Sequence, residues 1–230
     1  MKAGVVIPAL NEEASVGRIV SGIRAAADPI GSCRVVVADN DSTDATGEAA
    51  MAAGARVVRV AERGYGAACL GAISALGDWP DVLVFIDADG SSRPDELARL
   101  LDPIRRHRAD LVLGQRPADG PMTPPQRWGT RLAVTLTNLR WSSSFSDMGP
   151  FRAITRSAYE RLGMSDRTWG WTIEMQILAV RAKLDWVEVP VSWEKRIGGT
   201  SKISGSVSGV IRAGGRILWT VARYGLRSPW

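Results

Sequence analysis

Short runs of β-branched residues recur along the first half of the chain, and helix-like segments separate them. Between the runs, apolar residues keep a 3.6-residue spacing, as at Val16, Ile19, Val20 and Ile23. The runs are "GVVIP" (4–8), "CRVVVAD" (33–39), "ARVVRV" (55–60), "VLVFID" (82–87) and "DLVLG" (110–114). Strands that alternate with helices indicate parallel βαβ units, and strands this continuously apolar indicate a sheet covered on both faces. The pattern predicts an α/β protein with a mostly parallel central sheet flanked by helices.

Composition narrows the class of protein. The 230 residues are 45% hydrophobic and 23% charged, which is typical of a globular chain. The net charge of +5 favours anionic partners such as phosphates or an acidic membrane surface. Nucleic acid is not expected, because the basic residues are not interleaved with aromatics. Cys33 and Cys69 lack metal-ligand spacing, no signal-peptide pattern is evident, and no apolar run approaches roughly 18 residues, so we expect a cytoplasmic protein.

The alternation of apolar runs and helix-like segments stops at Gly114. The stretch "GQRPADGPMTPPQRWG" that begins there is rich in Pro, Gly and Arg and indicates a long irregular connection. Beyond it we expect helices at 126–140 and 172–183 and strands at 151–154 and 186–196. The predicted organisation is a domain over 1–202, with a ligand-binding half at 1–114 and a second half at 115–202. A C-terminal basic amphipathic extension covers 203–230.

Two carboxylates follow the apolar run "VLVFI" in the stretch "FIDADG". Side chains alternate along a strand, so Asp87 and Asp89 are expected on one side, with the small Ala88 between them. Their mutual repulsion indicates a nearby positive charge, and oxygen ligands of this kind suit Mg²⁺ or Mn²⁺. The alternative is that one aspartate caps the next helix and the other is solvated.

Polar residues also follow the other early strands. The second run ends in "ADNDSTD", which contains Asp39 and Asp41, and the first ends in "PALNEE". In a parallel sheet these turns meet at the edge where ligands bind, beyond the carboxyl ends of the strands. Helix capping explains some of these residues but does not explain all three strand ends together.

Four of these stretches, "VVIPALNEEASV", "VVVADNDSTDAT", "RGYGAACLGAISA" and "VFIDADGSSRPDEL", together resemble the nucleotide-binding half of family 2 glycosyltransferases. Those enzymes have the Rossmann-like GT-A fold. The later stretches "LVLGQR", "SDMGPFRAI" and "KRIGGTSK" are similar to polyprenyl-phosphate hexosyltransferases such as dolichyl-phosphate mannose synthase. The resemblance covers about residues 3–202, and the ordered set is more specific than any single motif.

The resemblance implies a set of site residues on the donor side. Asp87 and Asp89, with Ala88 between them, would hold a divalent metal, Mg²⁺ or Mn²⁺, against the diphosphate. Arg116, together with Arg127 or Arg131, would neutralise phosphates, although a solvated basic face is the alternative for the last two. The residues implied to line the nucleotide pocket are Pro8, Ala9, Asn11 and Glu12, with Asp39 and Asp41 on the base or ribose.

The resemblance also implies an acceptor side. Asp147 in "SDMGPFRA" would be the general base if the acceptor is a hydroxyl, but would only orient groups if the acceptor is an anionic lipid phosphate. Met148 and Pro150 depart from the usual Thr-Ser-Gly-like turn, which leaves the acceptor open. Glu174 is either a first-turn helix residue or part of the acceptor pocket. Arg196, Ser201 and Lys202 match a basic R-x-x-G-x-S-K stretch for phosphate, with a flexible linker as the alternative.

The C-terminal segment has the pattern of a basic amphipathic helix. At about 100° per residue, its arginines fall within an arc of roughly 60°. The arc holds Arg212, Arg216, Arg223 and Arg227, and opposite it lie Ile203, Val207, Val210, Ile217, Val221 and Tyr224. The helix is either a peripheral membrane contact or a packed helix with its arginines in water, and four glycines weaken it.

The leading hypothesis is an inverting, metal-dependent enzyme that moves a hexose from a GDP- or UDP-sugar to polyprenyl phosphate, in the cytoplasm or at the inner face of the membrane. Arg116, Asp147 and Lys202 are its expected catalytic residues. The first alternative keeps the donor chemistry but uses a soluble hydroxyl acceptor, such as a small glycoside or metabolite. A second is a catalytically inactive nucleotide-binding relative. A Rossmann dehydrogenase rests only on "GYGAAC", which lacks the third glycine of that motif.

Overall fold

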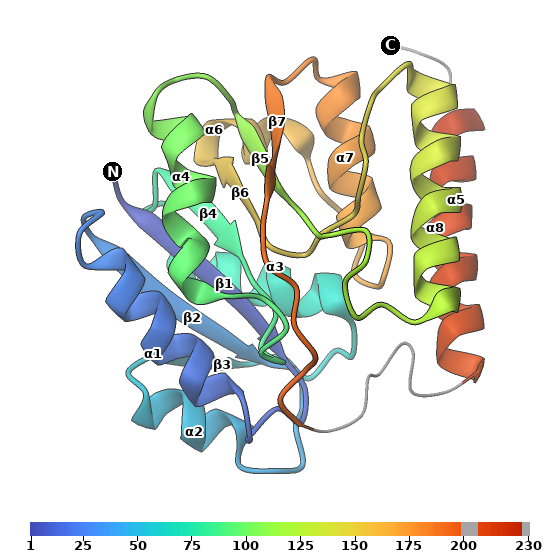
Figure 1. The fold of residues 1–230 in the computed structure, drawn as a ribbon. Coiled ribbons are helices and arrows are strands. Elements are labelled where there is room, and N and C mark those ends of the chain that lie inside the picture. The colour runs from blue at the N-terminus through green and yellow to red at the C-terminus, as the bar shows by residue number, and fades with distance from the viewer. Residues whose placement is uncertain (199–206, 227–230) are drawn as a thin grey trace.

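A computed structural model describes residues 1–198 and 207–226 of the chain, with side chains at 207–213 outside the description. The described residues contain a seven-stranded sheet in the order β3-β2-β1-β4-β6-β5-β7 (Figure 1). The strands are β1 (Ala3–Ala9), β2 (Cys33–Asp39), β3 (Arg56–Arg59), β4 (Val82–Phe85), β5 (Leu111–Gln115), β6 (Arg152–Thr155) and β7 (Trp186–Pro190). Among them only β6 runs antiparallel, between β4 and β5. The prediction of a mostly parallel α/β fold is confirmed.

Helices cover both faces of this sheet (Figure 1). On one face α1, α2 and α4 share a buried apolar core with the strands, and on the other α3 and α5 to α8 do so, with α8 packed on α5 and α7. The helices are α1 (Val16–Ala27), α2 (Thr46–Ala52), α3 (Tyr65–Leu76), α4 (Leu97–Arg105), α5 (Pro124–Trp141), α6 (Arg156–Leu162), α7 (Trp171–Arg181) and α8 (Val207–Leu226), with a 3₁₀ turn, η1 (Pro94–Glu96), before α4. Two-sided cover explains why Val5, Val6 and Ile7 are all fully buried although they alternate in direction.

The sequence periodicity located most of these elements. Helices expected at 126–140 and 172–183 are observed as α5 and α7, and a capping box between Thr123 and Gln126 fixes where α5 begins. The strand expected at 186–196 is wrong in its second half. β7 ends at Pro190, and beyond it Trp193 makes only an isolated bridge with Ser92.

The C-terminal helix forms despite its glycines, and α8 lies beside α5 (Figure 1). Its buried side holds Val221 and Tyr224, as the wheel predicts. Its exposed side is also apolar, which the arc of arginines did not predict. Arg216 turns inward to the buried Asp166, with its guanidinium 4.4 Å above the ring of Trp219. Ile203 and Arg227 lie outside the described residues, as do the side chains of Val207, Val210 and Arg212.

All six parallel strands point their carboxyl ends toward one edge of the sheet (Figure 1). The order of strands reverses between β1 and β4, since β2 and β3 follow β1 on one side while β4 lies on the other. A reversal of this kind leaves a crevice beyond the strand ends, and ligands bind there in open α/β sheets. No helix within 1–198 and 207–226 is long and apolar enough to cross a membrane.

Candidate active site

A pocket of about 680 Å³ opens at the carboxyl edge of the sheet. Its size is that of a small-molecule site. The turns after β1, β2, β4 and β5 supply one side, and residues of α5 and α8 supply the other. Among the site residues expected on the donor side, together with Arg196, those that line it are Pro8, Ala9, Glu12, Asp87, Ala88, Asp89, Arg116 and Arg196.

The two carboxylates that follow β4 both line this pocket. Asp87 accepts a hydrogen bond from the Tyr65 hydroxyl at 3.0 Å, and Asp89 accepts two from Ser91 at 2.9 and 2.6 Å. Burial raises the pKa of Asp87 to about 7, and the nearby charge of Asp89 adds to the rise. The pair therefore holds excess negative charge that a cation would relieve.

Arg196 supplies positive charge beside this pair. Its guanidinium forms a salt bridge with Glu12 and lies 3.4 Å from Asp89 Oδ2. The main chain after β7 thus crosses back over the ends of β1 and β4 and closes one end of the pocket. Lys202, the predicted partner of Arg196 in phosphate binding, lies outside the described residues, as does Ser201.

The donor set fits a divalent cation. Magnesium in substrate complexes typically takes one or two protein carboxylates, with phosphate oxygens and water completing its coordination. Asp87 and Asp89 provide two such groups, and no cluster of three or more His, Cys, Asp or Glu side chains with metal-binding geometry occurs in the described part of the chain. These two aspartates would hold the ion.

Arg116 and Asp147 form a nearly buried ion pair. The carboxylate of Asp147 accepts from the Arg116 backbone N–H, Nε and Nη2 at 3.0, 2.8 and 2.7 Å, so both of its oxygens are engaged. The two side chains are only 11% and 7% exposed. Burial pushes the pKa of Asp147 upward, but the hydrogen bonds and charge of Arg116 outweigh it and leave that pKa below its ordinary value.

Within this pair, Arg116 faces the pocket and Asp147 does not line it. The guanidinium also lies 4.9 Å from the ring centroid of Trp193, which lines the pocket as well. The backbone carbonyl of Asp147 accepts from the buried Gln176 at 2.9 Å, which holds Asp147 in place from behind. Asp147 therefore fixes the position of an arginine that faces the site.

The turn after β2 uses a different residue from those predicted. Asn40 lines the pocket, donates to the carbonyls of Val60 and Glu62, and accepts from the Gly64 N–H.

The two aspartates expected in this turn have other contacts. Asp39 accepts from the Ser42 N–H, and Asp41 pairs with Arg59 and Arg63 at the surface. Neither Asp39 nor Asp41 lines the pocket, whereas Arg63 does.

Asn11 also lies outside the lining of the pocket, in a left-handed backbone conformation with φ of 53°. Its side chain accepts from the Thr43 N–H, and its own N–H donates to Ser42. Asn11 therefore ties the turn after β1 to the turn after β2.

Of the two arginines expected on the donor side, Arg127 donates to the Gly120 carbonyl and Arg131 is exposed on α5, and neither lines the pocket.

The residues expected on the acceptor side differ in where they lie. Met148 and Pro150 line the pocket beside α5 and α8. Glu174 is fully buried and accepts from Ser165, Asp166 and Tyr224, so the pocket role considered for it is wrong.

Several residues that line the pocket were not singled out from the sequence. Tyr65 begins α3, and its ring lies 6.2 Å from that of Trp169, a residue contributed by the loop before α7. The sequence feature that could have indicated Tyr65 is "GYG", because the flanking Gly64 and Gly66 allow another segment to approach closely. A Cβ on either glycine would lie within 2.1 Å of a carbonyl oxygen in that loop.

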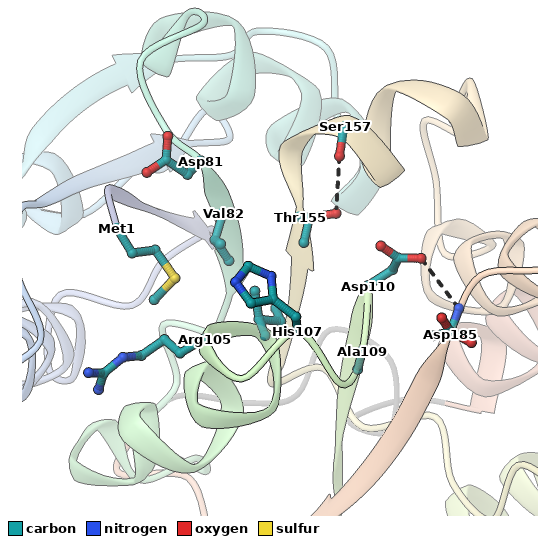
Figure 2. Close-up of a pocket in the computed structure, with 11 residues that line it drawn as sticks. Met1, Asp81, Val82, Arg105, His107, Ala109, Asp110, Thr155, Ser157 and Asp185 are labelled. Carbon is teal, nitrogen blue, oxygen red and sulfur yellow. Dashed lines mark hydrogen bonds between the residues drawn. The ribbon is translucent and has the colours of Figure 1, made fainter.

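A second hollow lies at the opposite edge of the sheet, around the amino ends of β4 and β5 (Figure 2). Asp81, Asp110 and Asp185 contribute three carboxylates, and the Asp185 N–H donates to Asp110 (Figure 2). Its basic lining residues are Arg105 and His107. The excess of carboxylates disfavours a phosphate ligand there, whereas Arg63, Arg116 and Arg196 favour one in the larger pocket.

Several known proteins are similar to this chain over most of its length. One is an uncharacterized glycosyltransferase of Mycobacterium tuberculosis, which is 36% identical over 91% of this chain and 93% of its own length. Another is a polyprenol monophosphomannose synthase of Mycolicibacterium smegmatis, which is 32% identical over 97% of this chain and 86% of its own length. A third is an undecaprenyl-phosphate mannosyltransferase of Micrococcus luteus, which is 29% identical over 100% of this chain and 96% of its own length.

Among solved structures, glucosyl-3-phosphoglycerate synthase of Mycobacterium tuberculosis in complex with Mn²⁺, UDP and glucosyl-3-phosphoglycerate superposes with a TM-score of 0.79. The match covers 99% of this chain and 81% of that one at 22% identity, and it supports the GT-A fold. The family model described as "Glycosyl transferase family 2" matches residues 4–163. With that match and relatives above 30% identity, the chain belongs to glycosyltransferase family 2 and is a glycosyltransferase.

Proposed function

We propose that this enzyme transfers a hexose from a nucleoside diphosphate sugar to a polyprenyl phosphate, with inversion and with a divalent metal. The observation that carries the choice of acceptor is the Arg116–Asp147 pair. A hydroxyl acceptor needs a general base, and the base must reach the hydroxyl and have a suitable pKa. Asp147 has both oxygens engaged, a lowered pKa and no place in the lining of the pocket.

The other acidic residues of the pocket are poor candidates for that base. Glu12 is paired with Arg196, and Asp87 and Asp89 are assigned to the metal. Among the described lining residues, these three are the carboxylates. An acceptor that is already anionic needs no base, and a phosphate monoester meets that condition.

The proposed reaction is a single displacement. An oxygen of the acceptor phosphate forms the new bond to the anomeric carbon, and the bond from that carbon to the diphosphate oxygen breaks. The nucleoside diphosphate leaves with its electron pair, and no proton is transferred. Arg116 and Arg196 stabilise the negative charge that grows on the leaving group, and a metal held by Asp87 and Asp89 would neutralise part of the same charge.

The relatives support this acceptor. The names of two of them specify a polyprenol or undecaprenyl phosphate acceptor and a mannosyl group, over nearly the full length of this chain. For this protein we propose the hexose class and a GDP- or UDP-linked donor.

A lipid acceptor requires contact with a membrane surface, and we assign that contact to α8 together with α5. Leu218, Trp219 and Leu226 are exposed on α8, and Trp128 and Leu139 on α5. Arg140 joins the two helices by donating to the Gly225 carbonyl. Both helices also line the pocket, so an anionic bilayer docked on them would present its phosphates beside the site. We therefore propose that the enzyme acts at the inner face of the cytoplasmic membrane.

The proposal is tested by comparing candidate acceptors in separate reactions. Nucleotide sugars labelled in the hexose are incubated with polyprenyl phosphate, with the matching polyprenol or with small hydroxyl acceptors, and the product is partitioned between an organic solvent and water. We expect label in the organic phase only in the reaction that contains polyprenyl phosphate. Transfer to a hydroxyl acceptor without transfer to the phosphate would overturn the proposal and favour a soluble acceptor.

A further inference from the structure

The hydroxyl of Tyr65 bonds to one of the two aspartates assigned to the metal. It donates to Asp87 Oδ1 at 3.0 Å, and the tyrosine ring lines the pocket. Residues that hydrogen-bond to metal ligands orient them, and their loss typically weakens metal affinity by roughly 10 to 100-fold. Tyr65 has the position for this role.

The backbone that carries Tyr65 is held on several sides. Tyr65 is the first residue of α3, and the N–H groups of Gly66 and Ala67 donate to the carbonyls of Thr168 and Arg167 at 3.2 and 2.9 Å. These bonds satisfy donors that a helix N-terminus otherwise leaves without partners. The start of α3 is thus capped by the loop that precedes α7.

The same loop is anchored in turn. Arg167 forms two hydrogen bonds with Glu62 at 2.6 Å, which join the loop to the segment just before Tyr65. Asp166 is 2% exposed; its N–H donates to Glu174, and its carboxylate accepts from Arg216 of α8. The phenol therefore approaches Asp87 from a rigid support, and little conformational freedom is lost in holding the bond.

We propose that Tyr65 is a positioning residue that orients the Asp87 carboxylate for the divalent cation. This inference rests on the proposed metal-dependent function and adds to it a residue that acts through its hydrogen bond to Asp87. With Oδ1 held by the phenol, rotation of the carboxylate is restricted. A pre-oriented ligand binds the cation more tightly because the entropy of ordering it is already lost in the apo protein.

Tyr65→Phe removes the hydroxyl alone and tests the role by metal binding rather than by turnover. Mn²⁺ affinity is measured by electron paramagnetic resonance at a saturating concentration of the preferred nucleotide, UDP or GDP, and nucleotide affinity is measured separately without metal. We expect the Mn²⁺ dissociation constant to rise about 10-fold, with metal-free nucleotide affinity unchanged. Tyr65→Leu, which also lacks the hydroxyl, should weaken Mn²⁺ binding at least as much.

Tyr159→Phe is the matched control, because Tyr159 is a buried tyrosine of α6 that does not line the pocket. Its Mn²⁺ affinity should equal that of the wild type. Unchanged Mn²⁺ affinity in Tyr65→Phe would overturn the positioning role and leave the proposed function standing. An equal loss of metal-free nucleotide binding would indicate a merely structural role. Failure of the wild type to bind Mn²⁺ with either nucleotide would overturn the metal site itself.

Discussion

At the scale of single residues, the Arg116–Asp147 pair decides most about the chemistry. The Asp147 carboxylate is 7% exposed and accepts three hydrogen bonds from Arg116. These bonds and the opposite charge offset the free-energy cost of burying each charged group, and removal of either partner leaves the other uncompensated. Asp147 therefore holds Arg116 in place, and its loss would leave the Arg116 guanidinium buried without a counter-charge. Activity and stability are linked at this position.

Asp147→Asn should reduce the free energy of unfolding by about 3 kcal/mol, because it leaves the Arg116 guanidinium nearly buried without a counter-charge. Urea unfolding at neutral pH measures the loss. Glu160→Gln is the control, since it removes the exposed Arg156–Glu160 pair and should change stability by no more than about 0.5 kcal/mol. Equal effects of the two variants would contradict the structural role of Asp147.

Asp87 makes the stability of the apo protein depend on pH. Its pKa is raised from 3.8 to about 7, so the native state binds this proton more tightly than the unfolded state. Ionisation of Asp87 therefore opposes folding, and the stability that it contributes falls as the pH rises from about 4 to about 7.

Asp87→Asn removes this pH dependence. Without metal, we expect the stability of the variant relative to the wild type to increase by a few kcal/mol between pH 4 and pH 8, because each unit of pKa shift corresponds to about 1.4 kcal/mol. Urea unfolding at the two pH values measures the difference. A difference of the opposite sign would show that Asp87 is stabilised as a carboxylate in the apo protein.

At the scale of elements, α8 shows why a helical wheel does not suffice to predict which side of a helix faces the solvent. The wheel correctly put Val221 and Tyr224 on one side, and it put the arginines together on the opposite side. Arg216 pairs with the buried Asp166, which is 50 residues away in sequence, so the exposed side of α8 carries the apolar residues Leu218, Trp219 and Leu226 instead of this arginine. Such pairing depends on tertiary contacts that periodicity does not contain.

The exposed apolar sides of α5 and α8 should bind anionic vesicles. We expect the Leu139→Ser and Leu226→Ser double variant to lose affinity for phosphatidylglycerol vesicles by roughly 10-fold or more, since each leucine is worth about 1 to 2 kcal/mol of burial. Co-sedimentation measures the affinity. Met51→Ser changes a methionine of α2 that is 56% exposed and should leave binding unaltered, so similar losses in both proteins would contradict the assignment.

At the scale of the whole molecule, the strand ends were predictable and the choice of inward-facing residue was not. Alternating strands and helices place Asp87, Asp89 and Arg116 at one edge, because parallel strands end together there. Asn40 rather than Asp39 or Asp41 lines the pocket because the turn after β2 bonds to Val60 and Glu62. Trp169 arrives from a distant loop, and no local pattern indicates its contact with Tyr65.

The proposed nucleotide and metal site is tested by thermal unfolding of the wild type and of Asp89→Asn, with UDP and with GDP, each with and without Mn²⁺. A ligand at 100 times its dissociation constant stabilises the native state by about 2.7 kcal/mol, which corresponds to roughly 5–10 °C for a protein of this size. We expect a shift of that order with one nucleotide, dependent on Mn²⁺ in the wild type and lost in Asp89→Asn. No shift with either nucleotide, or an equal shift without metal and in the variant, would contradict a nucleotide site built on Asp87 and Asp89.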